Sequence, residues 1–201
     1  MARLLFTSKK FGSFSDPIAA VQASSLEKLI GKSVQFMRQT HGNRISVVSE
    51  VGPIVEDSDS LITQNPAVAL AVRVADCIPL LLFSEKQVAA VHVGRKGLLN
   101  KIALKTIAKM KELGASQIQG VVGPHICGNC YEVDLKMAEE IHALHPATSG
   151  KAGHLNLFKG LQDQLAEIPL QDLKICTKEN AEYFSYRANS ESQRQIGVIS
   201  L

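Results

Sequence analysis

Three apolar segments follow one another closely in the middle of the chain, and they limit the possible folds more than any other feature. They occupy residues 67–74, 78–83 and 88–93. Each has the length of a β-strand and is apolar at almost every position, which is typical of strands that are covered on both faces. The polar residues 84–87 predict a hairpin-like connection between the second and third segments. We therefore expect a layered protein with these strands in its interior.

A helix is expected in the N-terminal part of the chain, from Asp16 and Pro17 to about Ile30. Asp16 can accept hydrogen bonds from the free backbone N–H groups of a first turn, and Pro17 suits the first helical position. Gly31 predicts the end of this helix, because glycine readily adopts the left-handed backbone conformation.

Later segments combine helices and strands without a regular order. Asp134 and Asn156 are predicted to cap the N-termini of two helices. Short closing strands are expected at 173–177, 183–186 and 195–200. This mixed order favours an α+β fold over a regular doubly wound sheet.

The composition is that of an ordinary globular protein, and the length of 201 residues suits a single domain over residues 1–201. Apolar residues make up 45% of the chain, charged residues 20%, and the formal net charge is +3. The basic residues are scattered and aromatic residues are few, so nucleic acid is not an expected partner. A small anion such as phosphate is compatible with this charge.

Cysteine usage and hydropathy point to a cytoplasmic protein. Four cysteines are too few to cross-link a chain of this size, so we expect them to be reduced. Residues 1–11 lack the apolar core of a signal peptide, and the longest apolar run, 78–83, is too short to span a bilayer. No membrane partner is expected, and the sequence leaves the oligomeric state open.

Two candidate metal ligands stand beside these apolar segments, and a third lies upstream of them. Cys77 lies between two apolar runs, His92 lies near the end of the third, and His41 lies upstream in the sequence Gln-Thr-His-Gly. A thiolate and two imidazoles are usual ligands of zinc and also suit copper. Three protein ligands would leave a fourth position for water or substrate, where zinc lowers the pKa of a bound water to about 7. The three are distant in sequence, so only the fold can bring them together.

Other roles for the same residues stay open. Cys77 and His92 also suit a thiol nucleophile and its base, with Asp76 or another polar group orienting the imidazole. That arrangement would indicate a hydrolase or deamidase that needs no metal. Each residue alone also suits a structural role, Cys77 as a small buried side chain and His92 as a hydrogen-bonded strand residue.

Five short motifs occur in the order in which one protein family carries them. They are Gln-Thr-His-Gly at 39–42, Ala-Asp-Cys-Ile-Pro-Leu-Leu at 75–81, Val-His-Val-Gly at 91–94 with Gly97, Gly123-Pro124 followed by Tyr-Glu-Val at 131–133, and Phe-Ser-Tyr-Arg at 184–187. The ordered set resembles the multicopper polyphenol oxidase, or laccase-domain, family. Members of that family are also described as purine nucleoside phosphorylases with adenosine deaminase activity. The resemblance extends from about residue 5 to residue 201.

The resemblance implies a mixed β-sandwich core with flanking helices. It implies a metal ion, usually zinc with copper as the alternative, held at His41, Cys77 and His92. It also implies phosphorolysis of adenosine, inosine, guanosine and methylthioadenosine, and deamination of adenosine. On this basis Asp76, Cys77 and His92 are the expected catalytic residues.

Basic residues near these motifs are candidates for binding the phosphate, and oxidase chemistry is an alternative to nucleoside chemistry. We expect Arg73, Lys96 and Arg187 to hold the phosphate, and Asp76 either to support a ligand or to accept a proton. Copper-dependent oxidation of phenols has been attributed to the family too. Three ligands for one ion, in a chain of six histidines, favour nucleoside chemistry over a multicopper oxidase. The fold is also similar to that of certain toxin deamidases with a Cys–His pair, which keeps the metal-free hypothesis open.

The chain departs from the family pattern in the pocket region. Arg95 and Lys96 replace a tryptophan and an arginine, and Ala188 replaces the second arginine after Ser-Tyr. Loss of the tryptophan removes an aromatic face on which a purine could stack, and lysine lacks the two-pronged guanidinium. A degenerate member that binds metal but has an altered substrate is therefore a third hypothesis.

Cys127 and Cys130 form a C-x-x-C pair of the kind found in redox sites and in half of a zinc site. We find no second pair at zinc-ribbon spacing, which favours two adjacent buried thiols without a shared role. The preceding Gly-Pro indicates a loop that lines the pocket, where His125 and Tyr131 would contact the substrate.

Overall fold

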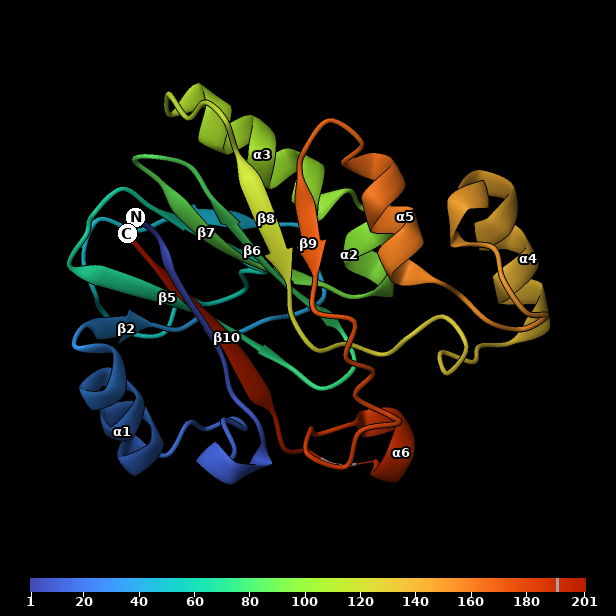
Figure 1. The fold of residues 1–201 in the computed structure, drawn as a ribbon, viewed down its shortest axis with the longest axis horizontal. Helices are drawn as coiled ribbons and strands as arrows, with labels where there is room; N and C mark the ends of the chain where they lie inside the picture. The colour runs from blue at the N-terminus through green and yellow to red at the C-terminus, as the bar shows by residue number, and fades with distance from the viewer. Residues whose placement is uncertain (191) are drawn as a thin grey trace.

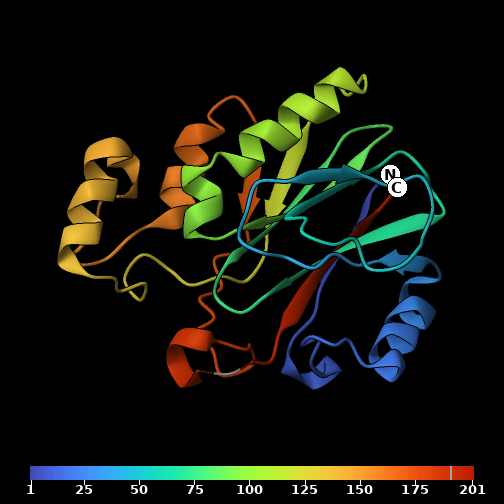
Figure 2. The same cartoon turned by 180° about the vertical axis from the view of Figure 1, so that it is seen from behind.

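Two stacked β-sheets with helices on their outer faces form the computed structural model, which describes residues 1–190 and 192–201 (Figures 1 and 2). The four-stranded sheet has the order β1 (Arg3–Phe6), β10 (Gln195–Ser200), β5 (Val68–Val74) and β2 (Ser33–Gln35). The six-stranded sheet has the order β3 (Ile45–Val47), β4 (Ser60–Thr63), β7 (Val88–Val93), β6 (Ile78–Phe83), β8 (Gln119–Val122) and β9 (Leu170–Asp172). Both sheets contain parallel and antiparallel pairs. The two termini lie side by side because β1 pairs antiparallel with β10.

The three apolar segments become β5, β6 and β7, but they do not share one sheet. β6 and β7 form the expected antiparallel hairpin, in which Phe83 is opposite Val88. β5 belongs to the other sheet, so the chain crosses from one sheet to the other between Val74 and Ile78. Residues 75–77, which include one of the candidate ligands, make this crossing.

Alternation of side chains along the central strands fills the space between the sheets. Leu70 and Val72 of β5 face the inter-sheet core with Leu81 and Ala90 of the hairpin. Ala71 of β5 points the opposite way, toward α1. Burying each large aliphatic side chain contributes about 1.5–3 kcal/mol, so strands that are buried on both faces fix the sandwich. The prediction of doubly covered strands is confirmed.

Helices cover the outer face of each sheet. The four-stranded sheet is covered by α1 (Ala20–Ile30). The outer face of the six-stranded sheet carries α2 (Arg95–Leu99), α3 (Ile102–Glu112) and α5 (Leu157–Gln164). Beyond α5, at one end of the molecule, lies α4 (Leu135–Leu144). The remaining short helices are η1 (Lys9–Phe11), η2 (Pro146–Thr148) and α6 (Tyr186–Asn189). The predicted α+β class, a mixed β-sandwich with flanking helices, is confirmed.

Two of the predicted helix N-termini are confirmed and one is wrong. Asp134 accepts a hydrogen bond from the N–H of Met137 at the start of α4, and Asn156 caps α5 in the same way. The first helix, however, begins at Ala20 rather than at Asp16 and Pro17. The Asp16 carboxylate instead faces two arginine side chains, as described below, and is not available to cap a helix.

The C-terminal segment has fewer strands than expected. The strand at 195–200 is confirmed as β10. The strand predicted at 173–177 is wrong, because Asp172 accepts a hydrogen bond from the N–H of Lys174, whose φ of 56° turns the chain away from the sheet. The strand predicted at 183–186 is also wrong, because Ser185 caps α6. No helix among the described residues has the length and apolar character needed to cross a membrane.

Candidate metal centre and pocket

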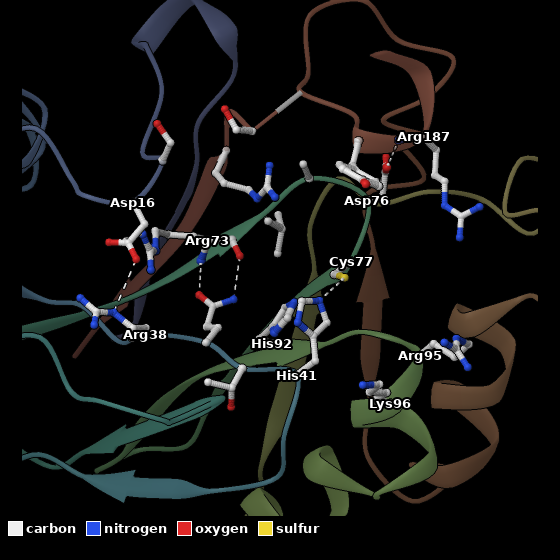
Figure 3. A pocket seen from close by; sticks show the side chains of 18 of the residues that line it. Asp16, Arg38, His41, Arg73, Asp76, Cys77, His92, Arg95, Lys96 and Arg187 are labelled. Carbon is white, nitrogen blue, oxygen red and sulfur yellow. Dashed lines mark hydrogen bonds and ion pairs between the residues drawn. The ribbon is translucent and has the colours of Figure 1, made fainter. Parts of the chain in front are cut away.

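The three candidate ligands His41, Cys77 and His92 converge on one point of the structure (Figure 3). Their ligand atoms all lie within 4.8 Å of one another. The Sγ of Cys77 lies 3.8 Å from Nε2 of His41, and the two imidazole rings meet edge to face with centroids 4.6 Å apart. The spatial requirement that the sequence could not decide is therefore met.

Each ligand is positioned by a different part of the sandwich. Cys77 is the last residue of the crossing between the sheets, and His92 lies on β7 opposite Pro79 of β6. His41 lies in the loop after β2 with a φ of 60°, in the left-handed region that few side chains adopt. Both sheets and a strained loop thus contribute to one site.

Asp59 organises this site and was not recognised in the sequence. Its side chain is fully buried, and one carboxylate oxygen accepts a hydrogen bond from Nδ1 of His92 at 2.7 Å. The same carboxylate accepts backbone N–H groups of Thr40, His41 and Gly42 at 2.7–3.2 Å. It therefore fixes the tautomer and orientation of His92 and holds the loop that carries His41. A carboxylate behind a histidine ligand is a frequent feature of metal sites.

The charges of the cluster favour a deprotonated thiol. Burial raises the pKa of Cys77, but the imidazoles of His92 and His41 outweigh it and lower the pKa to about 6. Burial lowers the pKa of His92, but the Cys77 thiolate and the Asp59 carboxylate raise it to about 9. The thiolate form that a metal ion requires is thus stabilised by the protein itself.

Gly94 leaves room for the cluster at the start of α2. A Cβ atom at this position would lie 3.0 Å from Sγ of Cys77 and 3.0 Å from Cδ2 of His41. Real Cβ atoms rarely approach other atoms so closely, so a larger residue would push both ligands apart.

We expect Gly94→Ala to weaken metal binding by about 10–100-fold, the range found when the support of a ligand is disturbed. The affinity is measured by competition with a chromogenic chelator. Gly150→Ala is the matched control, because a Cβ there meets nothing within 4 Å. Equal affinities of the two variants would contradict the placement of Gly94 against the ligands.

The donor set fits a zinc or copper ion. One thiolate and two imidazoles match the donors that both metals prefer. His92 is buried to 3% exposure, whereas His41 is exposed, so the cluster has a closed side and an open side. The open side faces a pocket of about 650 Å³. This is the volume of a small-molecule site.

Cationic side chains line the pocket on two opposite sides of the cluster (Figure 3). Arg38 and Arg73 lie on one side, and Arg95, Lys96 and Arg187 lie on the other. The three residues predicted to hold phosphate all line the pocket, but they do not form one group, because Arg73 is separated from the other two.

Arg73 is a buried cation with an incomplete set of partners. Its side chain is 8% exposed and donates through Nη2 to the carbonyl of Met37 at 3.1 Å. Nη1 lies 3.8 Å from Asp16, a carboxylate that Arg38 also contacts at 3.5 Å. Nε is buried without a hydrogen-bond partner among the described residues. Burial lowers the pKa of Arg73, and Asp16 compensates only in part.

The opposite side of the pocket combines charge with aromatic surface. The guanidinium of Arg187 lies over the Tyr131 ring at 4.9 Å and donates to the carbonyl of Glu132 at 2.7 Å. Tyr131 and Tyr186 both line the pocket. An aromatic face is therefore present although Arg95 stands where a tryptophan was expected.

Two residues from the sequence analysis have other surroundings than expected. Both oxygens of the Asp76 carboxylate are engaged at 2.7 Å, by the hydroxyl of Thr177 and by the backbone N–H of Arg187. This geometry favours a positioning role for Asp76 over proton transfer. His125 is buried, with Nδ1 bonded to the carbonyl of Gly123, and it does not line the pocket.

Comparison with known proteins agrees with this geometry. The profile of the multi-copper polyphenol oxidoreductase laccase family matches residues 15–201. The chain belongs to this family.

Two relatives with similar sequences are named purine nucleoside phosphorylases. A purine nucleoside phosphorylase of Corynebacterium glutamicum is 40% identical over 92% of this chain and 83% of the relative. A purine nucleoside phosphorylase of Streptomyces coelicolor is 34% identical over 94% of this chain and 86% of the relative. Such relatives support an enzyme of the purine nucleoside phosphorylase type within the laccase family.

The fold of this laccase-family chain also matches solved structures. The Bacillus licheniformis protein YfiH superposes with a TM-score of 0.86 over 100% of this chain and 92% of that chain. At 23% sequence identity this likeness establishes the fold alone.

Proposed function

We propose that the protein is a metal-dependent purine nucleoside phosphorylase that acts on adenosine, inosine, guanosine and methylthioadenosine. One observation carries the proposal: a pocket of about 650 Å³ connects the three metal donors to the incompletely paired cation Arg73. Phosphorolysis needs a site for an anion next to a site for a nucleoside, and this pocket offers both. The phosphorylase names of relatives at 34–40% identity support the same activity.

The proposed binding mode separates phosphate from base. Phosphate binds on the side of Arg73 and Arg38, where an anion would offset the buried positive charge of Arg73. The purine binds on the other side, where Tyr131 and Tyr186 provide stacking surface. The ribose then lies between them, in front of the open side of the cluster.

His41, Cys77 and His92 would hold the metal ion, preferably zinc with copper as the alternative. A bound ion supplies Lewis acidity at the open side of the cluster. The arginines position the phosphate for attack on the anomeric carbon as the C–N bond to the purine breaks, and such positioning provides much of the acceleration. Their charge also stabilises the transition state. Asp76 holds the backbone of Arg187 in place rather than receiving a proton.

An assay of inosine phosphorolysis tests the proposed function. Purified protein loaded with zinc is incubated with inosine and phosphate, and hypoxanthine release is followed. We expect release that depends on phosphate and stops when the metal is removed. No release from either the zinc-loaded or the copper-loaded protein, over a range of pH and substrate concentrations, would overturn the proposal.

Arg73→Lys tests the placement of phosphate. Lysine keeps the charge but loses the guanidinium fork, so at least one charge-assisted hydrogen bond, about 1.5–3 kcal/mol, is lost and the KM for phosphate rises roughly 10–100-fold. The KM for inosine should change little. Initial rates at varied phosphate and fixed inosine measure the effect.

Arg44→Lys serves as the control, because Arg44 is exposed and does not line the pocket. Lys96→Gln and Arg187→Lys examine the other two residues assigned to phosphate. A rise in the KM for phosphate in these two variants, with none in Arg73→Lys, would move the phosphate to the opposite side of the pocket.

Deamination of adenosine is proposed as a second activity of the same pocket, in a different binding mode in which the purine ring, and not the ribose, lies in front of the open side of the cluster. Conversion of adenosine to inosine without phosphate, measured by the loss of absorbance at the adenosine maximum, distinguishes it from phosphorolysis.

A metal-free thiol enzyme is the second candidate, and a specific arrangement favours it. Cys77, His92 and Asp59 form a connected series in which Asp59 orients the imidazole beside a thiolate. In this candidate Asp59 orients the imidazole, a role for which the sequence offered Asp76 or another polar group. Activity that survives complete removal of metal and is lost on alkylation of Cys77 would favour this candidate.

Two further alternatives make different predictions. A phenol oxidase requires copper and consumes oxygen. The described residues offer two groups able to hold a metal, and together these contain only two histidines, far fewer than a multicopper centre needs. A degenerate member with an altered substrate would bind metal at His41, Cys77 and His92 but turn over neither nucleosides nor phenols.

A further inference from the structure

A second cluster of metal-binding side chains lies outside the cluster of His41, Cys77 and His92. Cys127, Cys130, Cys176 and Glu179 place their ligand atoms within 4.8 Å of one another. The Sγ of Cys130 lies 3.2 Å from a carboxylate oxygen of Glu179. A tetrahedral zinc ion about 2.3 Å from each sulfur sets the sulfurs about 3.8 Å apart, which falls within this spread.

The spacing of these four residues repeats one pattern. Two residues separate Cys127 from Cys130, and two residues separate Cys176 from Glu179. Paired ligands at this spacing are typical of zinc ribbons. The sequence analysis found one pair and no second pair of cysteines, because the second pair ends in a glutamate.

Several backbone N–H groups surround the sulfur of Cys176. Its Sγ accepts the N–H of Cys127 at 3.3 Å and also faces the N–H groups of Lys178 and Glu179. The first pair has a similar turn, in which Cys130 and Tyr131 both donate to the carbonyl of Cys127. The N–H groups around Sγ of Cys176 stabilise negative charge on that sulfur, whereas burial and the neighbouring Cys127 thiol raise the pKa of Cys176 above its ordinary value.

We propose that Cys127, Cys130, Cys176 and Glu179 form a second, structural metal site that binds zinc. Binding replaces the three thiol protons with one Zn²⁺ ion, so three protons leave and no oxidant is needed. Four protein ligands close the coordination shell and leave no position for substrate.

The position of the site suggests what it stabilises. Residues 125 and 176 form an isolated parallel bridge, so the segments that carry the two pairs already run side by side. One segment continues to Tyr131, and the other leads through Thr177, which donates to Asp76, to Arg187. A zinc ion between the segments would therefore hold the aromatic wall of the pocket, where Arg187 lies over Tyr131.

Metal stoichiometry tests this site independently of activity. We expect two zinc ions per wild-type chain, measured by elemental mass spectrometry on protein purified without chelator. Cys176→Ser and His41→Asn should each retain one zinc ion, and the double variant none. Loss of zinc in Cys176→Ser alone supports this second site even if the cluster of His41, Cys77 and His92 binds no metal and the proposed function fails.

A cobalt-substituted protein provides a second readout. Cobalt thiolate absorption in the near ultraviolet should be strong in His41→Asn, where three thiolates remain, and weak in Cys176→Ser. Wild-type protein with one zinc ion, lost in His41→Asn and kept in Cys176→Ser, would overturn the proposal. The proposal would also be overturned if two cysteines of this cluster reacted with an alkylating agent only after reduction, because that result would show a disulfide between them.

Glu179→Gln covers the case in which Cys176→Ser does not fold, because Glu179 is exposed. Loss of this carboxylate should lower the affinity for the second zinc ion by at least about 10-fold, measured by chelator competition. Glu140→Gln, an exposed glutamate of α4, is the matched control and should leave both zinc ions in place. Equal affinities in these two variants would exclude Glu179 as a ligand.

Discussion

Replacing His41 with asparagine is expected to lower kcat/KM for inosine phosphorolysis by about 10³-fold, within the range for removal of a catalytic group. His41 is the exposed donor of the cluster, so its loss should remove metal without unfolding the protein. Asparagine is chosen because it tolerates the left-handed backbone conformation that His41 adopts. Hypoxanthine release and metal content are measured on the same sample.

His145→Asn is the control for this experiment, because His145 lies at the end of α4 and does not line the pocket. It should keep the activity and the metal of the wild-type protein. If His41→Asn were to lose its metal yet keep kcat/KM within a few-fold of wild type, the metal would have no part in the reaction.

Asp59→Asn is expected to lower the free energy of unfolding by about 3 kcal/mol, because it breaks a buried, charged hydrogen bond to His92. For a chain of this size that corresponds to a fall in Tm of about 6–12 °C. The amide group would also point an N–H at backbone N–H groups that now donate to the carboxylate. The comparison is made on metal-depleted protein, since bound metal adds its own stabilisation.

Asp57→Asn is a matched control from the same loop. Asp57 is exposed, has a φ of 49° that asparagine accommodates, and accepts one hydrogen bond from the hydroxyl of Thr40. An asparagine oxygen can replace this acceptor, so the stability should change by less than about 0.5 kcal/mol. Equal effects of the two substitutions would show that Asp59 is not the organising group.

The sequence predicted the convergence of the three candidate ligands better than the residue that supports them. His41, Cys77 and His92 could be named because soft and borderline donors are few and stood in ordered motifs. Asp59 could not, since a short polar loop has no periodicity that distinguishes a buried carboxylate from a solvated one. Its burial depends on the loop at 39–42, which packs over it only in the folded protein.

The layered fold was predictable, but the partition of its strands was not. Apolar runs indicated doubly covered strands, yet they carried no information on which sheet each strand would join. Arg73 lies on β5, whereas Lys96 lies on α2 and Arg187 on α6, so Arg73 is separated from the other two although all were expected to hold the same phosphate. Similarly, Cys176 and Glu179 lie far along the chain from Cys127, and the parallel pairing of β8 with β9, followed by the bridge at 125 and 176, brings them together.

The change of sheet at residues 75–77 has a consequence for how this family can diverge. Arg73 belongs to one sheet and His92 to the other. The distance between the proposed phosphate site at Arg73 and the imidazole of His92 therefore depends on the thickness of the hydrophobic core between the two sheets. Side chains such as Leu70 and Leu81 set that thickness without touching the pocket. Evolution can therefore adjust the fit for longer or shorter substrates from within the hydrophobic interior, while every residue of the cavity wall stays unchanged.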